Sequence, residues 1–230
     1  MAMQSIPLAD GAMPAFIALP SQPRGGAVVV IQEIFGVNRP LRATCEMVAD
    51  MGFIAVAPDL FWRLGEGIDL DDHKPNDFQT ALELLNKFDQ PTGIADLKAT
   101  LAFARRMPGA NGKAGTMGFC LGGRLAMLMA LHSDADVNIS YYGVGLDNLI
   151  GDLSVIRKPL LLHVAGSDGF FPESGRQKLA ASVADHKLIK HSSYEGADHA
   201  FARVGGQHYD GLHARIAHGR TAKALAAALR

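Results

Sequence analysis

Cys120 stands at the centre of a Gly-x-Cys-x-Gly sequence that spans residues 118–122. The apolar run 114–119 leads into it with the pattern of a short strand, and residues 124–131 continue with a helical pattern. A strand, a sharp turn framed by glycines and a helix are typical of a nucleophile elbow, which presents its central side chain at the carboxyl edge of a sheet. Serine is the usual residue at that centre. A cysteine in its place predicts a thiol nucleophile.

A nucleophilic thiol needs a base, and the base needs a partner that orients it. Asp168 follows the apolar run 160–165, and His199 lies in a loop after the strand-like run 187–190. The chain order nucleophile, acid, histidine is that of α/β-hydrolases. Cys120, Asp168 and His199 are therefore predicted to form a catalytic triad.

Several of the candidate residues also have a structural interpretation. Free cysteine is often a small buried residue, but the glycines around Cys120 and the acid and histidine downstream favour catalysis. Cys45 lies in a helical pattern without glycines and is expected to be structural. His163 lies inside an apolar run, where a hydrogen-bonded core histidine is expected. Asp198, beside His199, is a weaker candidate for the acid because no predicted strand delivers it.

Three further histidines lie near the C-terminus. His208, His213 and His218 are spaced by five residues, which does not align them on one face of a helix. They are therefore not expected to bind a metal. The sequence shows no cofactor-binding motif, so neither a metal nor a cofactor is predicted.

An attacked carbonyl group develops a negative charge that needs hydrogen-bond donors. One donor is expected to be the backbone N–H of Leu121, the residue after the nucleophile, at the start of its helix. The second usually comes from the loop after an early strand, here residues 31–38, and Ile34 N–H is the expected donor. These two groups are predicted to form the oxyanion hole.

The elements that must position these residues alternate along the chain. Short apolar runs predict strands, and stretches with a period near that of a helix predict helices. The alternation favours a mostly parallel twisted sheet with helices on both faces, preceded by an N-terminal antiparallel hairpin that turns at Asp10-Gly11. Ligands bind such sheets at the carboxyl ends of the strands. The predicted strands are residues 5–8, 15–19, 26–31, 53–57, 114–119, 137–141, 160–165 and 187–190, and the predicted helices are residues 40–51, 78–87, 93–107, 121–132, 173–184 and 211–229.

The composition fits one globular domain over residues 1–230. Hydrophobic residues make up 48% of the chain and charged residues 20%, which allows a sizeable core. With a net charge of −1 and no long basic run, neither nucleic acid nor a membrane surface is an expected partner. No apolar stretch is long enough to span a bilayer, and the N-terminus has no signal-peptide pattern. Two cysteines argue against a disulfide framework, so a reducing, cytoplasmic setting is predicted. A monomer is expected, with a small ester or lactone as its substrate.

Six segments resemble the dienelactone hydrolase (carboxymethylenebutenolidase) family and occur in the family's order. They are QEIFG (32–36), APDLF (57–61), GFCLGG (118–123), YYGVGL (141–146), GSDGFFP (166–172) and GADHAFAR (196–203). The resemblance implies an α/β-hydrolase fold and hydrolysis of a small lactone or ester through a cysteine thioester, as in the degradation of aromatic compounds. It also implies the triad of Cys120, Asp168 and His199 and the oxyanion donors Ile34 and Leu121.

The resemblance further implies roles for Glu33, Arg203 and Tyr141. Glu33 would be the partner of the resting thiol, and substrate binding would pull it toward Arg203, so that Cys120 can lose its proton to His199. An ordinary solvated loop charge is the alternative interpretation of Glu33. Arg203 and Tyr141 would contact the substrate.

The chain departs from the family at the substrate site. The family typically holds a substrate carboxylate with two arginines, and Arg203 matches one of them. Phe78 stands at the other position, and Leu82 stands where a tyrosine is expected, whereas Tyr141 is retained. Phenylalanine does not replace a bidentate arginine. A dienelactone-type hydrolase and a broad-specificity carboxylesterase acting on less anionic esters are both open, and a redox-sensing thiol or a binding domain is disfavoured by the complete triad.

Overall fold

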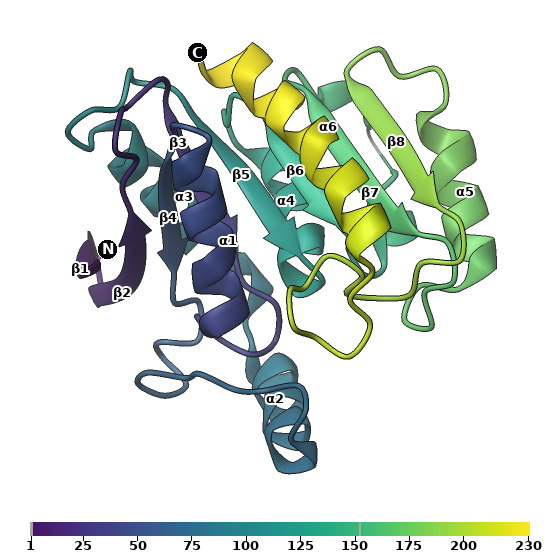
Figure 1. Ribbon diagram of the computed structural model, residues 1–230, viewed down its shortest axis with the longest axis horizontal. Coiled ribbons are helices and arrows are strands. Elements are labelled where there is room, and N and C mark those ends of the chain that lie inside the picture. The colour runs from purple at the N-terminus through teal and green to yellow at the C-terminus, as the bar shows by residue number, and fades with distance from the viewer. Residues whose placement is uncertain (1, 152) are drawn as a thin grey trace.

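The computed structural model describes residues 2–151 and 153–230 of the chain. One eight-stranded sheet runs through it in the order β1-β2-β4-β3-β5-β6-β7-β8 (Figure 1). The pairs β1/β2 and β2/β4 are antiparallel, and the pairs from β4/β3 to β7/β8 are parallel. The strands are β1 (Ala2–Leu8), β2 (Gly11–Ala18), β3 (Ala27–Ile31), β4 (Ile54–Pro58), β5 (Ala114–Phe119), β6 (Asn138–Tyr141), β7 (Leu160–Ala165) and β8 (Ile189–Tyr194).

The strand β3 shows why the central strands are apolar throughout. All of its residues are buried. Val28 and Val30 join the core on one face of the sheet, and Val29 and Ile31 join the core on the other. A strand that is covered on both faces has no polar side, so its sequence is a continuous β-branched run.

Helices cover both faces of the sheet (Figure 1). On one face, α1 and α6 share a core that includes Cys45 and Leu225. On the other, α3, α4 and α5 bury residues such as Leu101, Leu125 and Leu179. The helices are α1 (Arg39–Asp50), α2 (Pro75–Lys87), α3 (Gln90–Arg105), α4 (Leu121–His132), α5 (Glu173–Val183) and α6 (Gly211–Leu229), with 3-10 turns η1 (Leu146–Asn148) and η2 (Leu153–Val155). Within the described ranges, none of these helices has the length and hydropathy needed to cross a membrane.

The helix α2 occupies a different place from the others. It lies beyond the edge of the sheet to which the arrowheads of β5 and β8 point (Figure 1). Ala81 and Leu84 are its buried residues, and they anchor it to the core. The helix is therefore placed to form a wall over the carboxyl ends of the strands, where the sequence predicts the chemistry.

The predicted mostly parallel sheet, the N-terminal hairpin and the helices on both faces are confirmed, whereas several element boundaries differ. The last strand spans Ile189–Tyr194 instead of residues 187–190, because this edge strand carries the polar residues 191–193 and lacks an apolar run. Helix α2 begins at Pro75, three residues before the predicted start, because proline fits the first turn of a helix. The hairpin strands are also longer than predicted.

Candidate active site

Cys120 lies on the sharp turn between β5 and α4, as the sequence predicts. Its backbone has φ 54° and ψ −114°, a conformation that residues with a side chain rarely adopt. Glycines make the turn possible: a Cβ atom on Gly118 would lie 1.9 Å from the carbonyl oxygen of Gly122, and one on Gly122 would lie 2.4 Å from the carbonyl oxygen of Ile31. The local sequence therefore holds the thiol at the carboxyl edge of the sheet.

Backbone strain is concentrated around this turn. The non-glycine residues with positive φ in the described ranges are Cys120, Tyr142 with φ 37° and Ala200 with φ 64°. Ala200 follows His199 and lines the same cavity as Cys120. The ring of Tyr142 packs edge-on against the imidazole of His199, with 5.2 Å between the centroids. Strained backbone of this kind tends to gather at functional sites.

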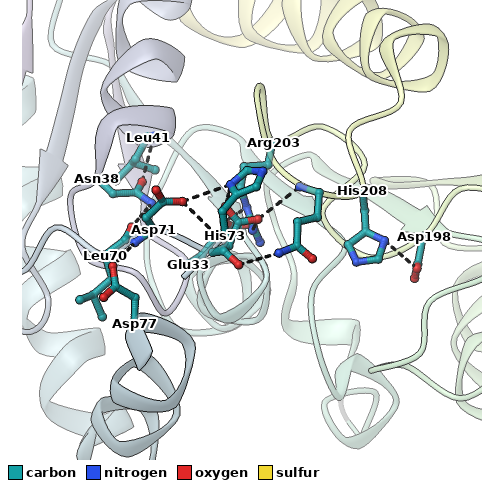
Figure 2. A network of polar contacts seen from close by, with 12 residues as sticks. Glu33, Asn38, Leu41, Leu70, Asp71, His73, Asp77, Asp198, Arg203 and His208 are labelled. Atoms are coloured by element: carbon teal, nitrogen blue, oxygen red, sulfur yellow. Dashed lines mark hydrogen bonds and ion pairs between the residues drawn. The ribbon is translucent and has the colours of Figure 1, made fainter. Parts of the chain in front are cut away.

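Asp168 and His199 form a buried hydrogen-bonded pair. Oδ2 of Asp168 lies 2.9 Å from Nδ1 of His199, and its Oδ1 accepts a hydrogen bond from Phe170 N–H at 2.8 Å. Asp198, the alternative acid, is half-buried and pairs with Nδ1 of His208 at 3.0 Å (Figure 2). Its contact with His199 is to the backbone N–H. Of the two acids, Asp168 is the one that contacts the ring of His199.

The surroundings of His199 raise its pKa to about 10. Burial acts in the opposite direction, because desolvation disfavours the charged ring. It is outweighed by negative charge on Cys120 and by the side-chain hydrogen bonds to Asp168 and Cys120. The arrangement therefore favours a protonated imidazole at His199.

A cavity of about 460 Å³ opens over Cys120 and His199. Clefts of this size commonly hold small molecules. Helix α2 contributes Phe78 and Leu82 to its wall, so Phe78 lies in the same cavity as Cys120, and its contact with substrate stays a prediction. Apolar side chains make up much of the remaining lining, and they include Ile34, Phe35, Leu85, Leu121, Val144 and Phe170.

Ile34 and Leu121 line this cavity beside Cys120. Leu121 is the first residue of α4, so its N–H has no partner within the helix. Ile34 follows β3, and β3 pairs in parallel with β5, so the loops after both strands leave the same edge of the sheet. Their positions agree with the sequence analysis, and their role as donors to an oxyanion stays a prediction.

Arg203 holds two carboxylates at the cavity (Figure 2). Its Nε donates to Oε2 of Glu33 at 2.5 Å, and its Nη1 donates to Oδ2 of Asp72. These side chains are 8%, 9% and 11% exposed for Arg203, Glu33 and Asp72, so both pairs are largely shielded from water. The guanidinium also lies over the ring of Phe35, 4.9 Å from its centroid. Burial opposes the charge of Arg203, but the Glu33 and Asp72 carboxylates are among the groups that raise its pKa.

The structure does not bring Tyr141 to the cavity. Its side chain is fully buried, and its hydroxyl group lies 2.7 Å from Thr221 Oγ1 and 3.0 Å from His218 Nδ1, both on α6. The next residue, Tyr142, packs against His199 instead. Tyr141, which the resemblance implies as a substrate contact, therefore lies away from the cavity over Cys120. The sequence does not distinguish the two adjacent tyrosines, because the direction of each side chain depends on the residue at which β6 ends.

His163 is a core histidine, as the sequence predicts. It lies 2.7 Å from the hydroxyl group of Tyr194 and 3.0 Å from that of Thr221. Burial, together with positive charge on neighbouring groups, lowers its pKa to about 3. Cys45 is likewise buried in α1, and burial raises the pKa of its thiol.

The three C-terminal histidines have separate partners. Their ring nitrogens contact different side chains, namely Asp198 for His208, Asp210 for His213 and Tyr141 for His218. A different group, Asp71, Asp72 and His73, brings three ligand-type atoms within 4.8 Å of one another. Asp72 is already bonded to Arg203, so this group forms part of an ion-pair network.

The sequence of this chain is similar to those of known proteins. The model of the dienelactone hydrolase family matches residues 13–229. The chain belongs to the dienelactone hydrolase family. A protein of Azospirillum brasilense that is assigned as a carboxymethylenebutenolidase is 42% identical over 224 residues, which cover 95% of each chain. The carboxymethylenebutenolidase of Pseudomonas putida is 36% identical over 212 residues, which cover 92% of this chain and 90% of that protein. This dienelactone hydrolase family member is thus a carboxylic ester hydrolase.

Solved structures agree with this family. A Klebsiella pneumoniae protein assigned as a dienelactone hydrolase superimposes with a TM-score of 0.84 and 27% identity, covering 98% of this chain and 97% of its own. Together with the strand order, this match confirms the α/β-hydrolase fold expected from the sequence.

Proposed function

We propose that this protein hydrolyses a small lactone or ester through a thioester on Cys120, with His199 as the base and Asp168 as its orienting acid. The observation that carries the proposal is the buried Asp168–His199 pair beside a cysteine on a strained turn. A base held at 2.9 Å by a carboxylate keeps one orientation and stabilises the charged ring. The cavity over the thiol supplies room for a small substrate.

In the first half-reaction, His199 holds the proton of Cys120 and the thiolate attacks the substrate carbonyl carbon. The oxyanion accepts hydrogen bonds from Ile34 and Leu121 N–H, and losing one such donor typically costs about 10²–10³ in rate. The C–O bond to the leaving group then breaks, and His199 gives its proton to the departing oxygen. The acyl group remains on Sγ of Cys120 as a thioester.

In the second half-reaction, His199 removes a proton from a water molecule, and the hydroxide attacks the thioester carbonyl. The C–S bond breaks, the carboxylic acid leaves, and the thiolate forms again beside the protonated ring. Substrates that release an enolate, such as a dienelactone, suit this route because the departing charge is delocalised and needs little help from an acid.

A broad carboxylesterase activity on less anionic esters is the second candidate function, and α2 favours it. Phe78 and Leu82 face the cavity at the positions where the family resemblance implies an arginine and a tyrosine. Phe78 also packs against Phe35, with 6.3 Å between ring centroids. Such a wall stabilises a bound substrate by burying apolar surface, at about 25 cal/mol per Å².

The test follows hydrolysis of a dienelactone and of p-nitrophenyl acetate by the wild type and by Cys120→Ala. We expect Cys120→Ala to lose kcat on any accepted substrate by about 10³-fold or more. Rapid quenching and mass spectrometry should detect an acyl adduct on Cys120 of the wild type.

Cys45→Ala is the matched control, because Cys45 lies buried in α1 and does not line the cavity. It should keep kcat and lose about 1 kcal/mol of stability through the small cavity that it leaves. Full turnover in Cys120→Ala would contradict the proposal.

A further inference from the structure

Asp72 is held firmly on Arg203. Its Oδ2 accepts hydrogen bonds from Nη1 of Arg203 and, at 3.4 Å, from the backbone N–H of Gln207. The side chain of Gln207 donates to the backbone carbonyl of Asp72 at 2.8 Å. Nδ1 of His73 lies 3.3 Å from Oδ1 of Asp72. The carboxylate of Asp72 is thus fixed from several directions at the cavity wall.

The basic side chains at this cavity wall already have carboxylate partners. One guanidinium, that of Arg203, faces the two carboxylates of Glu33 and Asp72. Among the described residues that line the cavity, Arg203 is the only arginine or lysine. The lining histidines also have carboxylate partners, since His73 contacts Asp71 and His208 contacts Asp198. A substrate carboxylate would therefore enter a site whose positive groups are already paired.

We propose that Asp72 is a specificity-determining residue that excludes anionic substrates and directs the enzyme to uncharged esters or lactones. This inference rests on the proposed hydrolysis at Cys120. Asp72 accepts from Nη1 of Arg203 and Glu33 accepts from Nε, so a substrate carboxylate could form a bidentate pair with this guanidinium only by displacing one of them. A substrate anion would have to displace Asp72 or lie beside it, and a like-charge contact of that kind is strongly unfavourable.

The apolar part of the cavity lining suits an uncharged substrate. Phe78 and Leu82 of α2 and Val144 after β6 present apolar surface to the same space as Cys120. An alkyl or aryl group can be buried there, whereas a carboxylate would lose its hydration without gaining a partner. The pairing of Arg203 with carboxylates and the apolar surface of α2 therefore both favour an uncharged substrate.

The test compares two esters that differ mainly in charge, p-nitrophenyl pentanoate and the mono-p-nitrophenyl ester of glutaric acid. We expect the wild type to prefer the pentanoate by about tenfold or more in kcat/KM. Asp72→Asn should raise the ratio of kcat/KM for the glutarate ester to kcat/KM for the pentanoate by about tenfold or more. If the asparagine variant does not fold, Asp72→Ser serves for the same ratio.

Asp69→Asn is the matched control, because Asp69 pairs with Arg42 at 2.8 Å on the same loop and does not line the cavity. It should leave the ratio between the two esters unchanged. An unchanged ratio in the Asp72 variants, an equal loss of both activities, or a wild-type preference for the glutarate ester would overturn the inference. Failure of the proposed function would show differently, as full hydrolysis of the pentanoate by Cys120→Ala.

Discussion

Two buried histidines of this protein have surroundings that shift their pKa values in opposite directions. His199 and His163 are 6% and 1% exposed, yet the pKa of His199 is raised to about 10 and that of His163 is lowered to about 3. Desolvation lowers both pKa values. His199 faces Asp168 and negative charge on Cys120, whereas His163 contacts hydroxyl groups and lies near positively charged side chains. The charge of the partners, and not burial alone, decides whether a buried ring holds a proton.

The same contrast separates two regions of the molecule. The site region, defined by Cys120, Tyr142, Asp168 and His199, contains residues with positive φ and the Tyr142 hydroxyl group, which has no hydrogen-bond partner among the described residues. The cluster under α6 contains Tyr141, His163, Tyr194, Thr221 and His218, joined by hydrogen bonds between 2.7 and 3.0 Å. The site region contains strained backbone and charged side chains. The cluster under α6 stabilises the packing of that helix on the sheet.

The strongest test of this contrast exchanges each histidine for glutamine. His199→Gln should lower kcat by about 10²–10⁴, because the base that receives the thiol proton is lost. His163→Gln should keep kcat and lose about 1–3 kcal/mol of unfolding free energy, because buried hydrogen bonds are removed. Steady-state kinetics and urea unfolding measure the two effects. A comparable loss of kcat in both variants would show that the two regions are not separate.

The pH dependence of stability should have opposite signs for the two rings. His163 takes up a proton in the unfolded state below its ordinary pKa of 6.5 but in the folded state only near pH 3, so its contribution to stability is lost as the pH falls through that window. His199 keeps its proton in the folded state up to about pH 10, so its contribution is lost as the pH rises from 6.5 toward 10. Each slope approaches about 1.4 kcal/mol per pH unit.

Urea unfolding of the wild type and the two glutamine variants checks these slopes. Relative to the wild type, His163→Gln should flatten the acid side of the stability profile, and His199→Gln should flatten the alkaline side. If His163→Gln changed only the alkaline side, the assignment of a neutral core ring would fail.

The smallest expected effect distinguishes the adjacent tyrosines. Tyr141→Phe removes a hydroxyl group that contacts Thr221 and His218, and it should cost about 1–2 kcal/mol of unfolding free energy. Tyr142→Phe removes a hydroxyl group without a partner in the described ranges, so stability should change by less than about 0.5 kcal/mol. Chemical denaturation of both variants provides the comparison, and an equal loss in the two would contradict a stabilising role for the hydroxyl contacts of Tyr141.

Local sequence patterns explain much of the fold and the order of the site residues. The β-branched run of β3 is apolar because both of its faces are covered, so the strand is visible in the sequence. The edge strand β8 is exposed or half-buried over residues 191–193, so its polar pattern conceals its length. Where one side of an element faces water, the sequence constrains its boundaries less.

The sequence by itself determined the elbow at Cys120, because the need for glycine at positions 118 and 122 is a local steric requirement. It also placed Asp168 and His199 after strands whose carboxyl ends meet at one edge of a parallel sheet. Only the tertiary structure decided that Tyr142, and not Tyr141, packs against His199 and that Arg203 is paired with Asp72, 131 residues away along the chain. Those choices depend on where a strand ends and how distant loops approach each other, which no local pattern encodes.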